Sequence, residues 1–380
     1  MGTAAEHART LTDYEQLGFG TGANLADGHA YHALNAGQAL IVDRMRELWA
    51  RSDAQSIPES EDLYVRRYAD LIGSPALRGA GHHLILPTAS NSIDLVAAYL
   101  RLTGGRVLLT HPTFDNLALI LRRRGVDVHP VSEREVVEAA ALDRVPAGAD
   151  VLFLVDPNNP TGTRLSAREF TAIAAACAEH GVVLVVDASF RLFYPQTWDA
   201  YGVLESSGAS YVVFEDTGKV FPTQDMKASL LTCSADHAPA LRELYNEIYL
   251  CVSKFSLMVL GEFFDDARAT GLDAAVRTLV ARRRAHLRRV LGERLVEPMA
   301  LPSRIGVEWL STARTGRDDE EVTADLRRRG VGVLPGRGFF WARRPGGPGR
   351  HNVRVSLMKP EDEFERGVDV LAEYFAEVVR

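Results

Sequence analysis

The sequence is poor in cysteine. Its three cysteines, Cys177, Cys233 and Cys251, are odd in number and widely separated, with no Cys-x-x-Cys pair. This pattern argues against a disulfide framework and against a structural zinc site, so we expect no metal centre. Long apolar runs are lacking too. No stretch of about 18 apolar residues occurs, so no transmembrane helix is expected. Residues 1–16 contain no signal-peptide-like apolar stretch, and a cytoplasmic location is therefore the default expectation.

An excess of positive charge is also absent. The chain has 43 Lys and Arg residues against 50 Asp and Glu residues, a formal net charge of -7. A mildly acidic chain is a poor candidate for binding nucleic acid or an acidic membrane surface. The two arginine runs, 282–284 and 327–329, are interpreted as solvated helix faces.

What the sequence does have is ordinary globular composition, with 46% hydrophobic residues in 380. That length and composition predict two or three compact units. Residues 1–35 are polar and rich in glycine, and we interpret them as an N-terminal arm or lid. Residues 36–280 are expected to form a large domain, and residues 281–380 a smaller α/β domain.

Apolar periodicity predicts helices that alternate with short buried strands. Helices are expected from residue 38, where Leu40, Ile41, Met45, Leu48 and Trp49 share a stripe, and over 92–102, 117–124, 166–179 and 277–291. Strands are expected over 106–110, 126–131, 150–155, 182–186, 211–214, 305–310, 331–334 and 353–357. Continuous apolar strands separated by helices predict an α/β fold with a mostly parallel sheet covered on both faces.

Three polar side chains follow three of these strands. Asn159 lies in a Pro-rich turn after strand 150–155, Asp187 ends strand 182–186, and Lys219 follows strand 211–214. Ligands bind open α/β sheets in the crevice beyond the carboxyl ends of the strands. The sequence therefore predicts that an amide, a carboxylate and a lysine meet at one edge of the sheet.

The Asp-Pro-Asn-Asn-Pro-Thr-Gly string at 156–162, followed by Asp187 and Lys219, resembles the class I/II aminotransferase family of fold-type I pyridoxal phosphate enzymes. The resemblance implies that Lys219 holds the cofactor and acts as the base at the substrate α-carbon. It implies that Asp187 pairs with the pyridine nitrogen and that Asn159 bonds the phenolic oxygen. A surface lysine, a strand-end cap and a turn-forming asparagine are the simpler alternatives.

The same resemblance implies further contacts. Cofactor contacts are expected from Phe114 on the ring face, from Ser189, and from Ser90, Asn91, Thr217 and Lys227 near the phosphate. Helix starts bind phosphate through backbone N–H groups, although simple helix capping is an equal alternative for Ser90 and Asn91. Arg354 is expected to hold the substrate carboxylate, with a surface arginine as the alternative.

The chain departs from the aminotransferase pattern in three places. Phe190 stands where the family usually has a tyrosine, Asp216 where it has a serine, and Lys227 where it has a phosphate-binding arginine. An anionic Asp216 would repel phosphate and is better suited to a cationic substrate group, such as a guanidinium.

These departures, with the stretches 24–30, 111–116, 215–219 and 222–223, resemble the pyridoxal phosphate-dependent arginine oxidases of enduracididine-, indolmycin- and azomycin-type pathways. The resemblance implies that L-arginine is oxidised with dioxygen as co-substrate. The products would be 4-hydroxy-2-oxo-5-guanidinovalerate, 2-oxoarginine or both, with ammonia and hydrogen peroxide.

By the same resemblance, the arm closes over the site and particular residues acquire roles. His29 would position or deprotonate the added water, although a hydrogen-bonded loop histidine is its simpler interpretation. Thr12 and Glu15, together with Asp216, would hold the guanidinium group. A homodimer is implied as well.

Three other functions stay open at this point. The chain could be an aminotransferase for a cationic amino acid, or a cyclase or lyase acting on hydroxyarginine. An amine-sensing regulator with this fold would need a winged DNA-binding domain, and the chain has neither the length nor a basic segment for one. A catalytically idle paralogue would be expected to lose Lys219, which is present.

Overall fold

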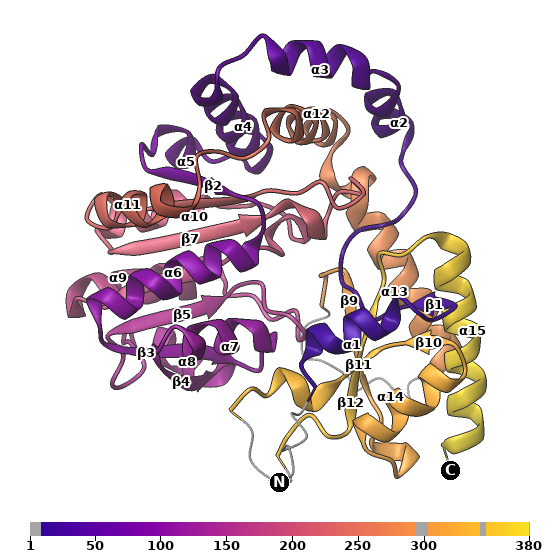
Figure 1. The fold of residues 1–380 in the computed structure, drawn as a ribbon. Helices are drawn as coiled ribbons and strands as arrows, with labels where there is room; N and C mark the ends of the chain where they lie inside the picture. The colour runs from indigo at the N-terminus through magenta and orange to yellow at the C-terminus, as the bar shows by residue number, and fades with distance from the viewer. Residues whose placement is uncertain (1–8, 293–302, 343–346, 380) are drawn as a thin grey trace, which may run out of the picture.

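The computed structural model describes residues 9–292, 303–342 and 347–379. Within these residues the largest sheet has seven strands in the order β2-β8-β7-β6-β5-β3-β4 (Figure 1). β8 runs antiparallel to both of its neighbours, and the other pairs are parallel. The strands are β2 (His83–Leu86), β3 (Arg106–His111), β4 (Asp127–Ser132), β5 (Val151–Val155), β6 (Val183–Asp187), β7 (Tyr211–Asp216) and β8 (Ser229–Cys233). The predicted α/β class with a mostly parallel sheet is confirmed.

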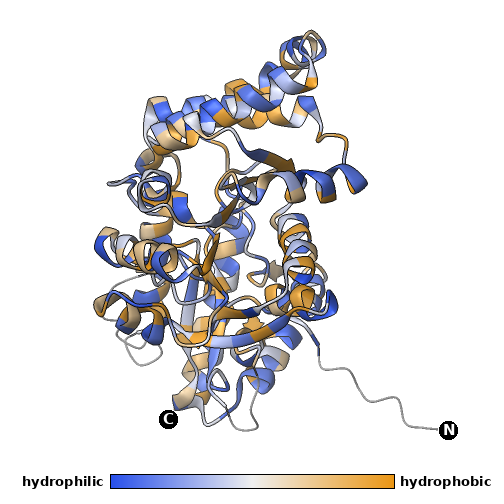
Figure 2. Ribbon diagram, turned by 90° about the vertical axis from the view of Figure 1, so that its left-hand side faces the viewer, coloured by the Kyte–Doolittle hydropathy of each residue, from blue (hydrophilic) through white to orange (hydrophobic). Residues whose placement is uncertain are grey.

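Helices cover both faces of this sheet, which explains why its strands are apolar throughout. In β5, Leu152 and Leu154 belong to the core on one face, whereas Val151, Phe153 and Val155 belong to the core on the other. The covering helices of this part are α4 (Ile57–Ile72), α5 (Pro75–Gly79), α6 (Ala89–Thr103), α7 (Asp115–Arg123), α8 (Glu133–Ala141), α9 (Ala167–His180), α10 (Ala200–Ser207), α11 (Ala238–Ile248) and α12 (Lys254–Thr270). Hydrophobic and hydrophilic residues alternate along these outer helices (Figure 2).

A second, three-stranded sheet has the order β11-β12-β9 in the described part of the C-terminal region. Its strands are antiparallel. The elements there are α13 (Thr278–Leu291), β9 (Val307–Ser311), α14 (Asp319–Arg328), β10 (Val331–Gly332), β11 (Leu334–Pro335), β12 (Asn352–Ser356) and α15 (Glu361–Val378). The positions of β9, β10, β11 and β12 were all predicted to be strands, although the structure divides the predicted strand 331–334 between β10 and β11.

The N-terminal segment lies between the two sheets rather than apart from them (Figure 1). Helix α1 (Leu11–Gly18) contacts α7 on one side and β10 and β11 on the other. Strand β1 (Ala23–Asn24) pairs in parallel with β10. The first eight residues of the expected arm lie outside the described residues. Backbone pairing and helix packing thus bring the arm against both parts of the molecule.

Local signals predicted both ends of one helix correctly. Ser166 caps α9 through its side chain, Glu169 completes the capping box, and Gly181 ends the helix with a positive φ of 64°. Glycine is favoured there because other residues rarely adopt this conformation. These ends were predicted from the sequence and are confirmed.

Other predictions were incomplete. The expected helical structure from residue 38 is confirmed, but it is divided into two helices, α2 (Ala36–Asp43) and α3 (Met45–Asp53), and the apolar stripe is not buried as a unit. Leu40 is 62% exposed and Trp49 is 64% exposed, although the Trp49 ring still contacts Phe255 of α12 at a ring-centre distance of 5.4 Å. Strands β2 and β8 were not predicted.

The arginine run at 282–284 was also misassigned. Arg283 and Arg284 are buried in α13 rather than solvated. Arg284 Nε donates to Glu308 Oε2 at 2.5 Å, and Arg283 donates to the carbonyl groups of Leu357 and Lys359. Partners far along the chain therefore satisfy charges that the local sequence suggested would face water. Among the described residues, no helix is both long and apolar enough to span a bilayer.

The first prediction concerns this buried charge cluster. Glu308 is 1% exposed and binds both Arg284 and Arg288, so Glu308→Ala leaves the buried Arg284 without its carboxylate. We expect a loss of about 3–5 kcal/mol in the free energy of unfolding, measured by urea denaturation. The control is Glu138→Ala, which removes an exposed pair with Arg134 and should cost less than about 1 kcal/mol. Equal losses in the two variants would contradict the interpretation.

Candidate active site

The polar side chains at the strand ends meet in one cleft of about 260 Å³. In the sheet register Val155 pairs with Asp187, and Asp187 pairs with Phe214, so the segments after β5, β6 and β7 leave the sheet side by side. Asn159, Asp187 and Lys219 all line the cleft. The structure thus brings together the three residues that the sequence placed at one edge.

Lys219 ends a short 3-10 turn, Thr217–Lys219, directly after β7. The Asp216 side chain caps this turn by accepting a hydrogen bond from Gly218 N at 2.6 Å. Lys219 Nζ lies 3.2 Å from His29 Nε2, and Lys227 Nζ lies 3.0 Å from the same nitrogen. The amines of two lysines from the segment between β7 and β8 therefore both contact one imidazole of the N-terminal segment.

His29 is held by a carboxylate that sequence reasoning did not assign. Its Nδ1 lies 2.6 Å from Asp27 Oδ1, and its backbone N–H donates to the same oxygen at 3.1 Å. Because a carboxylate only accepts, this pairing places the ring proton on Nδ1 and leaves Nε2 as an acceptor that faces Lys219. The charge of Lys219 and burial lower the pKa of His29, against the opposing effect of Asp27. His29 is therefore a neutral base at neutral pH.

Asp27 in turn has a second partner. Lys359 Nζ lies 3.2 Å from Asp27 Oδ2, and both side chains are almost fully buried. Burial would raise the pKa of Asp27, but the hydrogen bond from His29 and the charge of Lys359 outweigh it and hold the pKa well below its usual range. The signal that could have revealed Asp27 is its spacing, since an Asp two residues before a loop His can form a local side-chain turn.

Asp187 is buried, and its side chain has only one neighbouring donor residue in the described structure. Its Oδ1 accepts hydrogen bonds from Ser189 N at 3.0 Å and from Ser189 Oγ at 2.6 Å. Burial raises the pKa of Asp187 to about 6, although the Ser189 hydrogen bonds oppose this. A carboxylate in such a place is stabilised by a cationic or N–H group brought in from outside.

Arg354 contacts Asn159, the N-terminal arm and Phe114, which is the residue expected to stack on the cofactor ring. Its Nη1 donates to Asn159 Oδ1 at 3.5 Å, and its Nη2 donates to the Ala26 carbonyl. The guanidinium lies 5.8 Å from the ring centre of Phe114. Arg354 is 1% exposed, so the alternative of a surface arginine is excluded.

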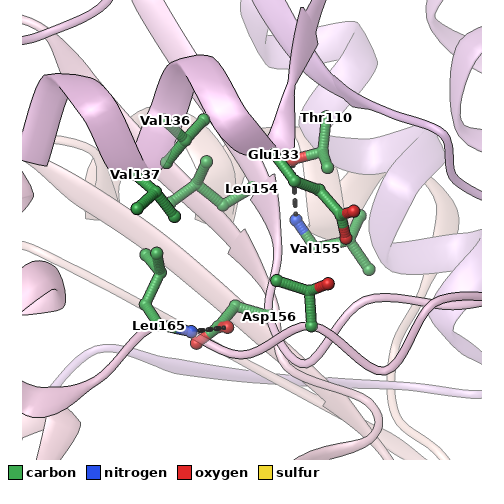
Figure 3. A pocket seen from close by; sticks show the side chains of 9 residues that line it. Thr110, Glu133, Val136, Val137, Leu154, Val155, Asp156 and Leu165 are labelled. Carbon is green, nitrogen blue, oxygen red and sulfur yellow. Dashed lines mark hydrogen bonds between the residues drawn. The ribbon is translucent and has the colours of Figure 1, made fainter. Parts of the chain in front are cut away.

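The loop that carries Asn159 is braced by three side chains, Asn158, Thr161 and Glu133, to which sequence reasoning gave no role. Asn158 Nδ2 donates to the Pro112 carbonyl and to Glu133 Oε1, each at 2.7 Å, and Thr161 Oγ1 donates to the same Glu133 oxygen at 2.5 Å. Glu133 and Asp156 line a small cavity of about 20 Å³ among apolar side chains (Figure 3). This bracing ties the loops after β3, β4 and β5 together.

The expected phosphate residues are only partly gathered at the cleft. Helix α6 begins at Ala89, so Ser90 and Asn91 lie in its first turn rather than before it. Ser90 and Lys227 line the cleft. Asn91 Nδ2 instead donates to Tyr249 Oη, and the Thr217 hydroxyl bonds the backbone of Ala228.

The expected substrate residues all line the cleft, namely Thr12, Glu15, Asp216 and Arg354. Helix α1 carries Thr12 and Glu15, and it is held down where Leu11 N donates to Asp115 Oδ2 at 3.0 Å. Asp216 is 6% exposed and its Oδ2 accepts from Ala89 N at 3.0 Å. Both of its oxygens thus already have backbone donors, and a role toward the substrate stays a prediction.

The cleft fits pyridoxal phosphate on its own features. It offers a lysine amine, a buried carboxylate with a raised pKa, and the N-terminal end of α6, where Ser90 lines the cleft and the helix dipole favours an anion. Phe190 lines the cleft where the aminotransferase pattern has a tyrosine, and it stacks on Phe193. A phenol donor is therefore missing at this position.

The comparisons with known proteins agree with this fit. A family model described as aminotransferase class I and II matches residues 14–371. The structure of MppP soaked with the product 2-ketoarginine is 37% identical, with a TM-score of 0.84, and the match covers 92% of this chain and 98% of that one. Aspartate aminotransferase from Thermus thermophilus with maleate is 16% identical, with a TM-score of 0.75 and coverage of 98% and 100%; this likeness shows the fold alone.

A curated relative is more distant. Histidinol-phosphate aminotransferase 2 of Caulobacter vibrioides is 29% identical over 167 residues, which are 43% of this chain. The chain spans only 42% of the length of that relative. LL-diaminopimelate aminotransferase of Dehalococcoides mccartyi is 24% identical over 346 residues, which are 84% of this chain and 86% of that protein.

The second prediction concerns Asp187 in the cofactor-free protein. Its pKa is raised to about 6 from 3.8, so between these values the folded state binds more protons than the unfolded state. The stability from this group is present below pH 3.8 and is lost as the pH rises toward about 6. Because two pKa units correspond to roughly 3 kcal/mol, Asp187→Asn should lose less unfolding free energy than the parent between pH 4 and 7.

The measurement is urea denaturation of both apoproteins across this pH range. Asp156, whose pKa burial also raises to about 6, contributes equally to both and cancels in the comparison. Parallel stability curves for the parent and Asp187→Asn would show that Asp187 is not destabilised by burial. With cofactor bound, the parent should become the more stable protein, because the variant lacks the carboxylate that is expected to pair with the cofactor.

Proposed function

The chain belongs to the aminotransferase class I and II family, and on that premise we propose that it is an arginine oxidase. In this proposal pyridoxal phosphate binds at Lys219, and L-arginine is oxidised by dioxygen. The products are 4-hydroxy-2-oxo-5-guanidinovalerate, 2-oxoarginine or both, together with ammonia and hydrogen peroxide. Each two-electron oxidation of the substrate reduces one dioxygen molecule to peroxide, so no redox metal is required.

The observation that supports this proposal most strongly is the likeness to MppP. It extends over 98% of that protein at 37% identity, and 2-ketoarginine is named as the product there. The cleft has the matching charges, since it is lined by the buried Arg354 and also by the acidic side chains of Glu15 and Asp216. An amino acid with a cationic side chain has groups of opposite charge for both.

The cofactor, when bound, supplies an electron sink that stabilises negative charge at the substrate α-carbon. Lys219 takes the α-proton in this proposal. His29 accepts at Nε2, 3.2 Å from Lys219 Nζ, while Asp27 fixes its ring. A neutral imidazole in this position can hold a proton passed from the lysine or from water, and it is thereby placed to assist the addition of water to the substrate chain.

The docked N-terminal segment excludes bulk water from the reaction. Helix α1 covers the cleft with Thr12 and Glu15 on its wall, and its Leu11 packs in an apolar cluster with Ala26, Leu334 and Phe339. Enclosure of this kind strengthens the electrostatic interactions inside and protects reactive species from hydrolysis.

Transamination of a cationic amino acid is the second candidate. It is favoured by the names of the curated relatives, which include histidinol-phosphate and LL-diaminopimelate aminotransferases. The two reactions differ in their second substrate, since transamination needs a 2-oxo acid and oxidation needs dioxygen.

The third prediction separates these two reactions. Holoenzyme with L-arginine in air should consume oxygen and release peroxide and ammonia, because dioxygen accepts the electrons. Mass spectrometry should detect the oxo-acid products without any added 2-oxo acid. Lys219→Ala is the control, and it should lose both oxygen uptake and borohydride trapping of the cofactor. Glutamate formed in proportion to added 2-oxoglutarate, without oxygen uptake, would establish the aminotransferase instead.

The fourth prediction tests the role of Asp216 in recognising the cation. Asp216→Asn keeps one side-chain oxygen, which can accept from Gly218 N or from Ala89 N but not from both, and it removes the negative charge. We expect the KM for L-arginine to rise roughly tenfold, because hydrogen bonds to a charged group contribute more than neutral ones. The KM for L-norvaline, whose side chain carries no cationic group, should change little. An equal change for both amino acids would assign Asp216 to the turn and the cofactor rather than to the substrate.

A further inference from the structure

The arm already touches the residue expected to bind the substrate carboxylate. Glu15 Oε1, from α1, lies 3.4 Å from Arg354 Nη2, from β12. Arg354 is 1% exposed and Glu15 is 17% exposed at the side chain. A carboxylate of the protein therefore occupies the position next to Arg354 to which a carboxylate ligand would be attracted.

This contact answers an electrostatic need of the empty cleft. A buried guanidinium is costly unless an anion or several acceptors surround it. Burial lowers the pKa of Arg354, and Glu15 and then Asp27 oppose this effect. Asp27 is already paired with Lys359 and His29. Glu15 is thus the carboxylate in direct contact with Arg354.

We propose that Glu15 determines specificity by exchanging partners: its carboxylate binds Arg354 in the empty site and moves to the substrate's cationic side chain when the substrate carboxylate takes over Arg354. The proposal rests on the proposed function, because it assumes a cationic amino acid as substrate. Thr12 lies three residues earlier on α1 and so faces the same side as Glu15. The new partner of Glu15 would lie in the cleft that both residues line.

The exchange needs only a side-chain movement. Helix α1 is anchored independently of Glu15, by the bond from Leu11 N to Asp115 and by the packing of Leu11 against Leu334 and Phe339. The arm can therefore remain docked while the Glu15 carboxylate changes partner. Its half-buried position keeps it within the enclosed cleft in both states.

Selectivity follows from what happens to Glu15 in each case. A substrate with a cationic side chain replaces the partner that Glu15 loses. A substrate with an apolar side chain displaces Glu15 from Arg354 and leaves its carboxylate beneath the docked arm without a cation. Uncharged amino acids are thus penalised even when their carboxylate fits Arg354 as well as that of arginine, which is discrimination by an unfavourable state.

The fifth prediction uses two probes that lack an α-amino group and so cannot react. Valerate carries only the carboxylate, and 5-guanidinovalerate carries the carboxylate and the guanidinium. In Glu15→Gln holoenzyme the competitor at Arg354 is gone, so valerate should bind roughly tenfold more tightly than to the parent. The affinity for 5-guanidinovalerate should change much less, because the lost competitor and the lost partner offset each other. Calorimetric titration measures both affinities.

The matched control is Gln16→Lys, which changes the net charge by the same amount at an exposed position of α1. It should leave both affinities unchanged. If Glu15 were only a ligand for the guanidinium group, Glu15→Gln would leave valerate binding as it is and weaken 5-guanidinovalerate. That result would overturn the exchange, as would unchanged binding of both probes. An unaltered cofactor spectrum and melting temperature verify that the variants are folded.

These affinities are independent of oxidation. Failure of the parent enzyme to consume oxygen with L-arginine would refute the proposed oxidase, and tighter valerate binding by Glu15→Gln would still support the exchange. Conversely, an active oxidase whose Glu15→Gln variant binds valerate no better would retain the proposed function and lose the exchange.

Discussion

The cleft depends on one constraint, which is that each buried charge must have a partner of opposite sign. Asp27 meets this requirement with Lys359, and Arg354 meets it with Glu15. Asp187 does not meet it within the described protein, and burial raises its pKa to about 6. The buried charges that the arm contacts are therefore paired, whereas the carboxylate at the end of β6 has no cationic partner in the described protein. A cationic ring nitrogen at Asp187 would complete it.

The central site residues were predictable because a parallel sheet gives the sequence little freedom there. Asn159, Asp187 and Lys219 each follow a continuous apolar strand, and adjacent parallel strands end at the same edge. Glu133 carries no comparable local signal, and Asp27 is marked only by its two-residue spacing from His29. Their partners are contributed by segments distant in sequence, as with Asp27 and Lys359, and only the folded chain shows that these carboxylates hold His29 and the Asn159 loop in place.

Charge and apolar patterns failed where a single helix face was judged without its neighbours. Arg284 sits in a run of three arginines, and such runs usually face water. Glu308, on a strand that pairs in another sheet, makes its burial possible. Leu40 and Trp49 show the reverse case, since they share a stripe with buried residues yet remain exposed. Whether a helix face is buried depends on the element that packs against it. Apolar periodicity identifies that face but not the element that packs there.

The division of labour within the cleft explains how one family scaffold can support a different reaction. The seven-stranded sheet supplies Lys219, Asp187 and Asn159, which suit the cofactor whatever the substrate. The residues of the arm, by contrast, belong to a segment that lies outside this sheet. Strand β1 of the arm pairs with β10 of the C-terminal part. Changes in the arm can therefore alter which amino acid is accepted and how water reaches it without disturbing the sheet. Fold likeness accordingly predicts the cofactor more securely than the reaction, because the proposed reaction also relies on residues of the N-terminal segment.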